Sequence, residues 1–347
     1  MDRVVRIKRQ LAKFKKLFHF ASIQLEKGTI MQVVQSIHLP FAATSIAINE
    51  EKQCIAVSNA FAGELRVINF ETQELIKTFE FEDNLYNGVN NILWKGSRIV
   101  AVTGAETEIR VWNDEGSETV ISLTPCSVEG ILLSEDGNIL TVLCDTPSLH
   151  YMKQNGLDIF ENIFQFHLPS LKGKSNATLN DATQKADLPF EIQAGLYLNK
   201  NLLILGNTKH EPYPFGLYEF NFNQSENETN CFLQITSSPS DTSKLTRIKD
   251  QLFSIGEIED VFRLFAINLE KNNVSEITVP QGYGLQTICE YHDQLFMTLF
   301  KDEQWFLMNQ STGDIYKLGG ISTEGIGASA NYLATGVDES VLFWSEA

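Results

Sequence analysis

The sequence predicts an all-β protein built as a ring of seven repeated sheets and preceded by one amphipathic helix. From residue 29 onward, short strand-like runs alternate with turns roughly every ten residues, a spacing typical of all-β barrels and propellers. The runs divide into six units of four strands and a seventh unit of three strands. Two of these units carry the same motif, and such self-similarity marks a repeat architecture.

The shared motif links a threonine, an acidic residue and a tryptophan. Segment 102–112 reads VTGAETEIRVW and contains Thr103 and Trp112, while segment 333–344 reads LATGVDESVLFW and contains Thr335, Asp338 and Trp344. Both segments resemble the inner half of a WD-repeat propeller blade, although the histidine of such blades is absent from the loops before them. The resemblance implies a seven-bladed β-propeller over residues 29–347, in which these residues hold a blade together. It leaves function open, because propellers serve many unrelated roles.

The seventh unit ends after its third strand, at 340–344. An alternating segment at 29–39 precedes the first unit, and its pairing with 340–344 would close the ring without an open sheet edge. In the third unit we expect strands at 130–133, 139–143, 148–152 and 158–166. The polar, weakly periodic segment 170–189 that follows is expected to be a mobile insertion outside the blades.

Residues 1–28 are expected to form a separate basic helix. Segment 3–27 lacks glycine and proline, its apolar residues follow a heptad seam that includes Leu11, Phe14 and Phe18, and Gly28 suits a helix C-terminus. Three interpretations remain open. The helix packs on its own ring, pairs with a partner's helix, or binds an anionic membrane or RNA through its basic residues.

Charge is unevenly distributed along the chain. Residues 1–16 hold seven basic residues against one acidic residue, so this segment carries +6 of a net charge of −17 and the rest carries −23. The acidic body argues against broad nucleic-acid binding. The five cysteines form no CxxC pair, and no apolar run is long enough to span a bilayer. We therefore expect buried, reduced thiols and a cytoplasmic protein.

No catalytic or metal-binding motif is present, so we expect a non-enzymatic protein without cofactor or metal. Enzymatic propellers place reactive groups where the innermost strands begin. There this sequence offers a set of polar residues: Asn90, Asn91, Glu129, Gln193, Arg247, Gln286 and Glu324. Asparagine and glutamate suit a hard cation, whereas an arginine opposes one. We expect five of these residues to bind a partner: Asn90, Glu129, Arg247, Gln286 and Glu324.

A proline-rich turn at 210–216 carries Tyr213 and Phe215, which either bind a partner or fold back on their blade. The function expected from these observations is a scaffold that binds protein partners within a multiprotein complex. Two alternatives remain open at this point. One is a hydrolase or lactonase with a metal in the channel, and the other is an accessory subunit docked on RNA or a membrane by residues 1–16.

Overall fold

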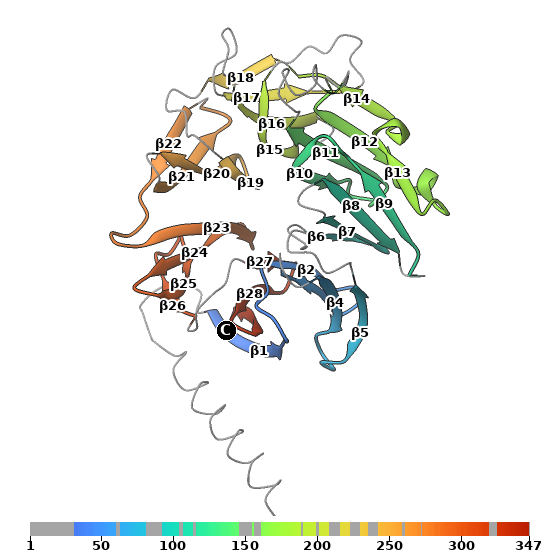
Figure 1. Ribbon diagram of the computed structural model, residues 1–347. Coiled ribbons are helices and arrows are strands. Elements are labelled where there is room, and N and C mark those ends of the chain that lie inside the picture. The colour runs from blue at the N-terminus through green and yellow to red at the C-terminus, as the bar shows by residue number, and fades with distance from the viewer. Residues whose placement is uncertain are drawn as a thin grey trace, which may run out of the picture.

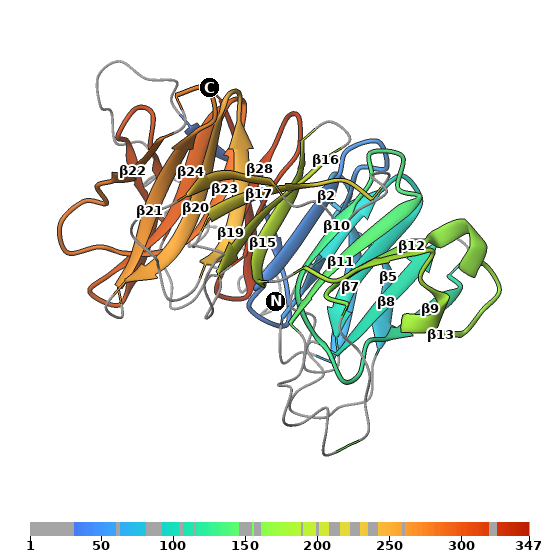
Figure 2. The same cartoon turned by 90° about the horizontal axis from the view of Figure 1, so that it is seen from above.

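The computed structural model describes residues 31–59, 63–80, 92–103, 107–113, 116–145, 155, 161–188, 190–198, 201–207, 216–222, 230–234, 242–258, 261–271, 273–318 and 325–346. These residues form seven sheets arranged in a ring, which is the architecture of a seven-bladed β-propeller (Figure 1). Figure 2 shows the same sheets from above. The predicted all-β class and the predicted number of blades are confirmed.

Each blade takes most of its strands from consecutive segments. Blade 1 contains β2 (Ser45–Asn49), β3 (Cys54–Ser58), β4 (Glu64–Asn69) and β5 (Leu75–Glu80). Blade 2 contains β6 (Ile92–Lys95), β7 (Arg98–Thr103), β8 (Glu108–Asn113), β9 (Glu118–Ser122) and β13 (Asn176–Thr178). Blade 3 contains β10 (Ser127–Leu133), β11 (Ile139–Asp145), β12 (Ile163–His167) and β14 (Gln184–Ala186).

The later blades follow the same plan. Blade 4 contains β15 (Glu191–Leu198), β16 (Asn201–Asn207), β17 (Gly216–Phe220) and β18 (Asn230–Gln234), and blade 5 contains β19 (Thr242–Ile248), β20 (Gln251–Ile258), β21 (Val261–Asn268) and β22 (Asn273–Ile277). Blade 6 contains β23 (Gly284–Tyr291), β24 (Gln294–Lys301), β25 (Gln304–Asn309) and β26 (Ile315–Lys317). Blade 7 contains β27 (Ile326–Ala328), β28 (Leu333–Val337), β29 (Ser340–Glu346) and β1 (Met31–His38).

Burial follows the position of a strand within its blade. All five residues of β3 and all five of β28 are buried, whereas the outermost strands β5 and β22 contain no buried residue. A central strand is covered on both faces by neighbouring blades, so its sequence is almost continuously apolar. An outermost strand lies at the rim of the ring, where part of each side chain meets water.

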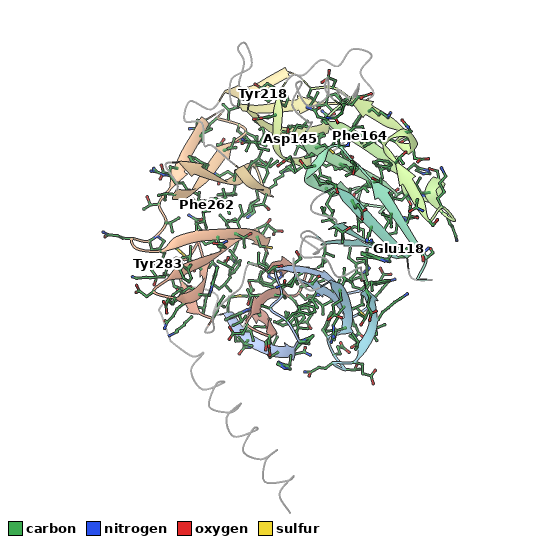
Figure 3. The ribbon with its side chains drawn as sticks, viewed as in Figure 1. Glu118, Asp145, Phe164, Tyr218, Phe262 and Tyr283 are labelled. Carbon is green, nitrogen blue, oxygen red and sulfur yellow. The ribbon has the colours of Figure 1, made fainter. Side chains whose placement is uncertain are left out.

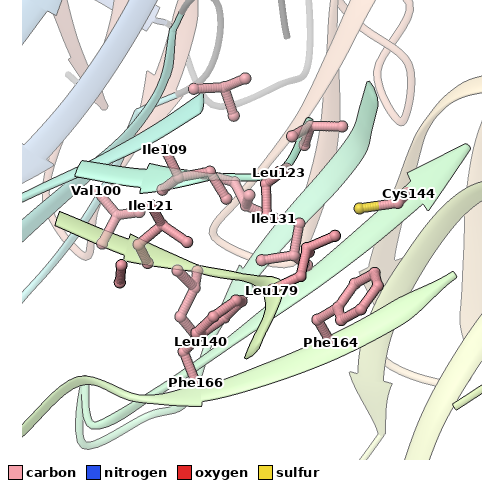
Figure 4. Close-up of a cluster of buried hydrophobic side chains, with 14 of the residues drawn as sticks. Val100, Ile109, Ile121, Leu123, Ile131, Leu140, Cys144, Phe164, Phe166 and Leu179 are labelled. Atoms are coloured by element: carbon pink, nitrogen blue, oxygen red, sulfur yellow. The ribbon is translucent and has the colours of Figure 1, made fainter. Parts of the chain in front are cut away.

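The described residues form seven hydrophobic clusters, each of which lies between two successive blades and holds them together. Figure 4 shows the cluster between blades 2 and 3, where Ile109 and Ile121 lie with Leu140 and Phe164. The last cluster joins blade 7 to blade 1, so apolar contacts continue around the ring. A rigid ring of this kind is a suitable support for a binding site.

The fourth strand of blade 7 is β1, which pairs antiparallel with β29. The register places Ile37 opposite Val341 and Met31 opposite Glu346, with an irregularity at Val34. Ile37 is buried among residues of blades 7 and 1, and Met31 is buried among residues of blades 6 and 7. The strand therefore contributes to the apolar cores on both sides of blade 7.

The expected strand order of the third blade is wrong. The strand beside β11 is β12, with Leu140 opposite Phe166, and the fourth strand is β14. Residues 148–152, expected as the third strand, lie outside the described residues. The error arises because segment 148–152 between β11 and β12, which reads SLHYM, alternates polar and apolar residues as a strand does.

The segment 170–189 is also not a simple insertion. It begins within the 3-10 helix η1 (Leu168–Leu171) and contains β13, the 3-10 helix η2 (Leu179–Asp181) and β14. Strand β13 pairs in parallel with β9 and places Ala177 opposite Ile121, which extends blade 2 to five strands. Apolar side chains of this polar segment join two cores. Leu171 and Leu179 are buried between blades 2 and 3, and Ala186 and Leu188 are buried between blades 3 and 4.

Several predicted features lie outside the described residues. They are the helix of residues 1–28 with Leu11, Phe14 and Phe18, and the turn residues Tyr213 and Phe215. Within the described part of the chain, no helix has both the length and the apolar character that a membrane span requires.

Candidate interaction face

The ring has two faces that the strand order defines. The upper face is the one at which the innermost strands begin, and it also holds the ends of the second strands and the starts of the third. The lower face holds the turns between the first and second strands. Figure 1 shows the innermost strands, among them β10, β15 and β23, around the middle of the ring.

A β-bulge recurs near the start of the innermost strand in four successive blades. The register shifts at Glu129 in β10, Gln193 in β15, Ser243 in β19 and Gln286 in β23. A bulge re-aims the extra residue and is common beside functional sites. Glu129 is exposed, and Gln193 and Gln286 are half-buried. Three of the predicted polar residues therefore occupy equivalent positions at the upper face.

Arg247 does not lie at the upper face with these three residues. The expectation that it begins its innermost strand is therefore wrong. It lies four residues beyond the bulge of β19, opposite Leu252, and its Nε donates to the Lys249 carbonyl at 2.8 Å. Four residues of a strand span about 13 Å, so Arg247 belongs to the lower end of its strand. Asn90, Asn91 and Glu324 lie outside the described residues.

Four acidic residues lie at or near strand ends on the upper side of blade 3 and are termed the acidic group: Glu129, Asp145, Glu161 and Asp187. Figure 3 labels Asp145 in this part of the ring. The register brings the ends of their strands together, because Asp145 lies opposite Ser127 and the Asn162 N–H donates to the Ala186 carbonyl.

Burial and the negative charge of the acidic group raise the pKa of groups at this end of blade 3. Burial raises the pKa of the Cys126 thiol to about 11, and Asp145 and Glu161 add to the rise. Burial likewise raises the pKa of Asp187, with Glu161 contributing. Among the described residues, no three histidine, cysteine or acidic side chains are placed to hold a metal ion. A basic segment of a partner is a suitable ligand for such a surface.

Large apolar side chains are exposed at the upper ends of blades 5 and 6. Val261 and Phe262 begin β21 and are 54% and 42% exposed, and Phe300 near the end of β24 is 39% exposed. The Phe300 ring lies 5.2 Å from that of Trp305, and the Lys301 ammonium lies 4.7 Å from the centre of the Tyr283 ring.

Figure 3 labels Phe262 and Tyr283 on neighbouring sheets at this side of the ring. Phe262, Tyr283 and Phe300 are termed the aromatic group. Rigid aromatic side chains at a surface are typical anchors of protein interfaces.

Four of the five residues predicted to be structural are buried, and the fifth, Asp338, is exposed. Trp112 and Trp344 are both buried, and the Trp344 indole donates to the Thr335 hydroxyl at 2.9 Å. Asp338 is exposed in the turn between β28 and β29, where its φ is +47°. Thr103 is buried in β7.

Sequence reasoning missed a polar network on the lower face. Glu50, in the turn between β2 and β3, accepts from the Ser329 hydroxyl and from the backbone and side-chain amides of Asn331. His292 approaches the same turn of blade 7 from blade 6. The sequence marks His292 only as part of a two-residue hairpin turn with Asp293, in which both residues have positive φ.

No protein-family model matches this chain, and no curated protein matches it.

Proposed function

We propose that this chain is a non-catalytic interaction scaffold of the WD-repeat type, acting in the cytoplasm as a subunit of a multiprotein complex. The observation that carries this proposal is the exposure of two large apolar residues, Val261 and Phe262, at consecutive positions at the start of β21. The residues that follow them in β21, such as Leu264, are buried. Adjacent exposed apolar side chains on a rigid element favour a role in binding.

The partner that fits the upper face is a protein segment with apolar side chains and net positive charge. The apolar side chains would contact the aromatic group, and the positive charge would be attracted by the acidic group. Charged groups at an interface mainly accelerate association, while buried aromatic anchors supply most of the affinity. Raising the salt concentration should therefore slow binding more than it speeds dissociation.

The test is affinity capture by the full chain, with mass spectrometry of the proteins retained. Phe262→Asp places a charge in the aromatic group, and the proposal expects it to abolish capture of a specific protein. Ile76→Asp is the matched control, because Ile76 is 57% exposed on the outermost strand of blade 1, away from the upper-face groups. Equal capture by both variants would refute the proposed face.

Residues 1–28 are tested separately by deletion and by Phe14→Asp. If the seam of Leu11, Phe14 and Phe18 pairs with a partner's helix, Phe14→Asp should reduce capture. An accessory subunit docked on RNA or on an anionic membrane should instead bind these surfaces in a salt-sensitive manner that survives Phe14→Asp.

A further inference from the structure

His292 lies on the lower face, where blades 6 and 7 meet. Its Nε2 lies 2.5 Å from the carbonyl oxygen of Ala330, in the turn between β27 and β28. Its Nδ1 lies 3.2 Å from a carboxylate oxygen of Glu346, in β29. The imidazole stacks on Tyr291, whose hydroxyl donates to the Asn331 carbonyl at 2.9 Å. One residue of blade 6 therefore contacts two separate segments of blade 7.

Both contacts of the imidazole are with groups that only accept hydrogen bonds. A neutral imidazole carries one donor and one acceptor, whereas the imidazolium carries two donors. Only the protonated ring can donate to Ala330 and to Glu346 at the same time. We infer that His292 is a pH-sensitive latch between blades 6 and 7, closed when the imidazole is protonated and released from one of its two acceptors when it is neutral.

The groups around His292 favour the protonated, charged form of its imidazole. The hydrogen bond to the Ala330 carbonyl raises the pKa of His292, and Glu346 and Glu290 add to the rise, while burial opposes it. Glu50 is a further negative charge in this network. Asp293, the next residue of the turn, forms an ion pair of 3.4 Å with Lys249 of blade 5.

The other shifted groups of this network keep their charge state near neutral pH. Burial would raise the pKa of Glu50, but its hydrogen bonds from Ser329 and Asn331 outweigh burial and lower it. Burial raises the pKa of Tyr291 to about 12. Glu50 thus stays charged and Tyr291 stays neutral while His292 titrates.

The direction of the pH dependence follows from the raised pKa of His292. A group with a raised pKa in the folded state stabilises the fold fully below its unfolded pKa and loses that contribution as pH rises through its folded pKa. The latch is therefore closed in mildly acidic solution and opens as the solution becomes alkaline. Because 40% of the His292 side chain is exposed, added salt should weaken it.

The test compares the melting temperatures of the full chain and of His292→Gln between about pH 6 and about pH 9. Glutamine keeps a side-chain NH2 group as a hydrogen-bond donor but cannot become a cation. We expect the wild type to melt a few degrees above the variant at the acidic end, and this difference to vanish at the alkaline end. A difference that stays constant with pH would overturn the inference.

His38→Gln is the matched control. His38 lies on β1 in the sheet of blade 7, at the end opposite Glu346. It is 75% exposed and 4.0 Å from Glu339, and its replacement should change neither melting nor pH dependence. A direct measurement uses NMR, in which the histidine signal missing from His292→Gln identifies His292. It should titrate above 6.5 in the wild type and lower in Glu346→Gln. A value at or below 6.5 in the wild type, or no change in Glu346→Gln, would rule the latch out.

Discussion

The indole Nε1 of Trp344 donates a hydrogen bond of 2.9 Å to the hydroxyl of Thr335 across strands β29 and β28. Both side chains are buried. Blade 2 has the same pair of residue types at the same spacing, Thr103 and Trp112. There the Thr103 hydroxyl is buried, and none of the described residues provides it with a hydrogen-bond partner. The two copies of the motif are alike in sequence but differ in how well their polar groups are satisfied.

This difference predicts that replacing each threonine by valine changes the free energy of unfolding by different amounts. Thr335→Val leaves the buried indole N–H without its acceptor and should lower the free energy of unfolding by about 1–3 kcal/mol. Thr103→Val removes a hydroxyl that is not hydrogen-bonded to any described residue and should be neutral or slightly stabilising. Urea unfolding of both variants measures the two effects, and equal losses would show that the motif is satisfied alike in both blades.

Trp344 should act through packing and not as a contact for a ligand. It is buried in the cluster between blades 6 and 7, with its ring 5.8 Å from that of Tyr316. Trp344→Ala should cost roughly 3–5 kcal/mol of stability, as is usual when a large buried aromatic side chain is truncated. Thermal unfolding measures this cost. A variant that melts normally but fails to bind a partner would contradict the packing role.

Strand β1 should be required to keep the ring closed. Its removal would leave β29 with unpaired backbone groups and expose the cores on both sides of blade 7, so deletion of residues 31–38 should yield aggregated protein. A milder test is Ile37→Asp, which places a charge in a buried position, against Val34→Asp at a position that is 45% exposed. Only the first substitution should lower solubility and stability. A soluble deletion variant that melts cooperatively would refute this role.

The polar residues at the upper face should not hold a metal ion. We expect the purified, dialysed protein to retain far less than one equivalent of any divalent cation, as measured by elemental analysis. A stoichiometric cation that is lost in Glu129→Gln would instead favour the alternative of a metal-dependent hydrolase.

The buried thiols of Cys126 and Cys144 should be unreactive in the folded protein. Only the thiolate attacks a disulfide reagent, and burial raises the pKa of Cys126 to about 11 and that of Cys144 as well. Mass spectrometry after treatment at neutral pH should find both unmodified, and modified once urea is added. Half-buried Cys289 serves as the internal comparison. Rapid modification of Cys126 without denaturant would show that its surroundings open readily.

Much of the fold could be predicted because the repeat is local. Strand-like runs, turns and the spacing from Thr335 to Trp344 all lie within one unit, so the number and order of the blades follow from the amino-acid sequence. The positions of Glu129, Gln193 and Gln286 at the starts of their strands follow from the same order. The third blade could not be predicted in this way, since the sequence offers strand-like runs both at 148–152 and at β12. Only the tertiary structure shows that β12 is the strand that pairs with β11.

The sequence by itself determined the period of the repeat, the apolar central strands and the acidic character of the body. The tertiary structure alone decided which distant segments meet: β13 beside β9, the bulges that align three polar residues, and the two acceptors around His292. The alternation of apolar and polar residues in the sequence indicates to which side of its own sheet each side chain points. Contacts such as those of His292 with Ala330 and Glu346 arise only when the packing of whole blades brings separate turns together.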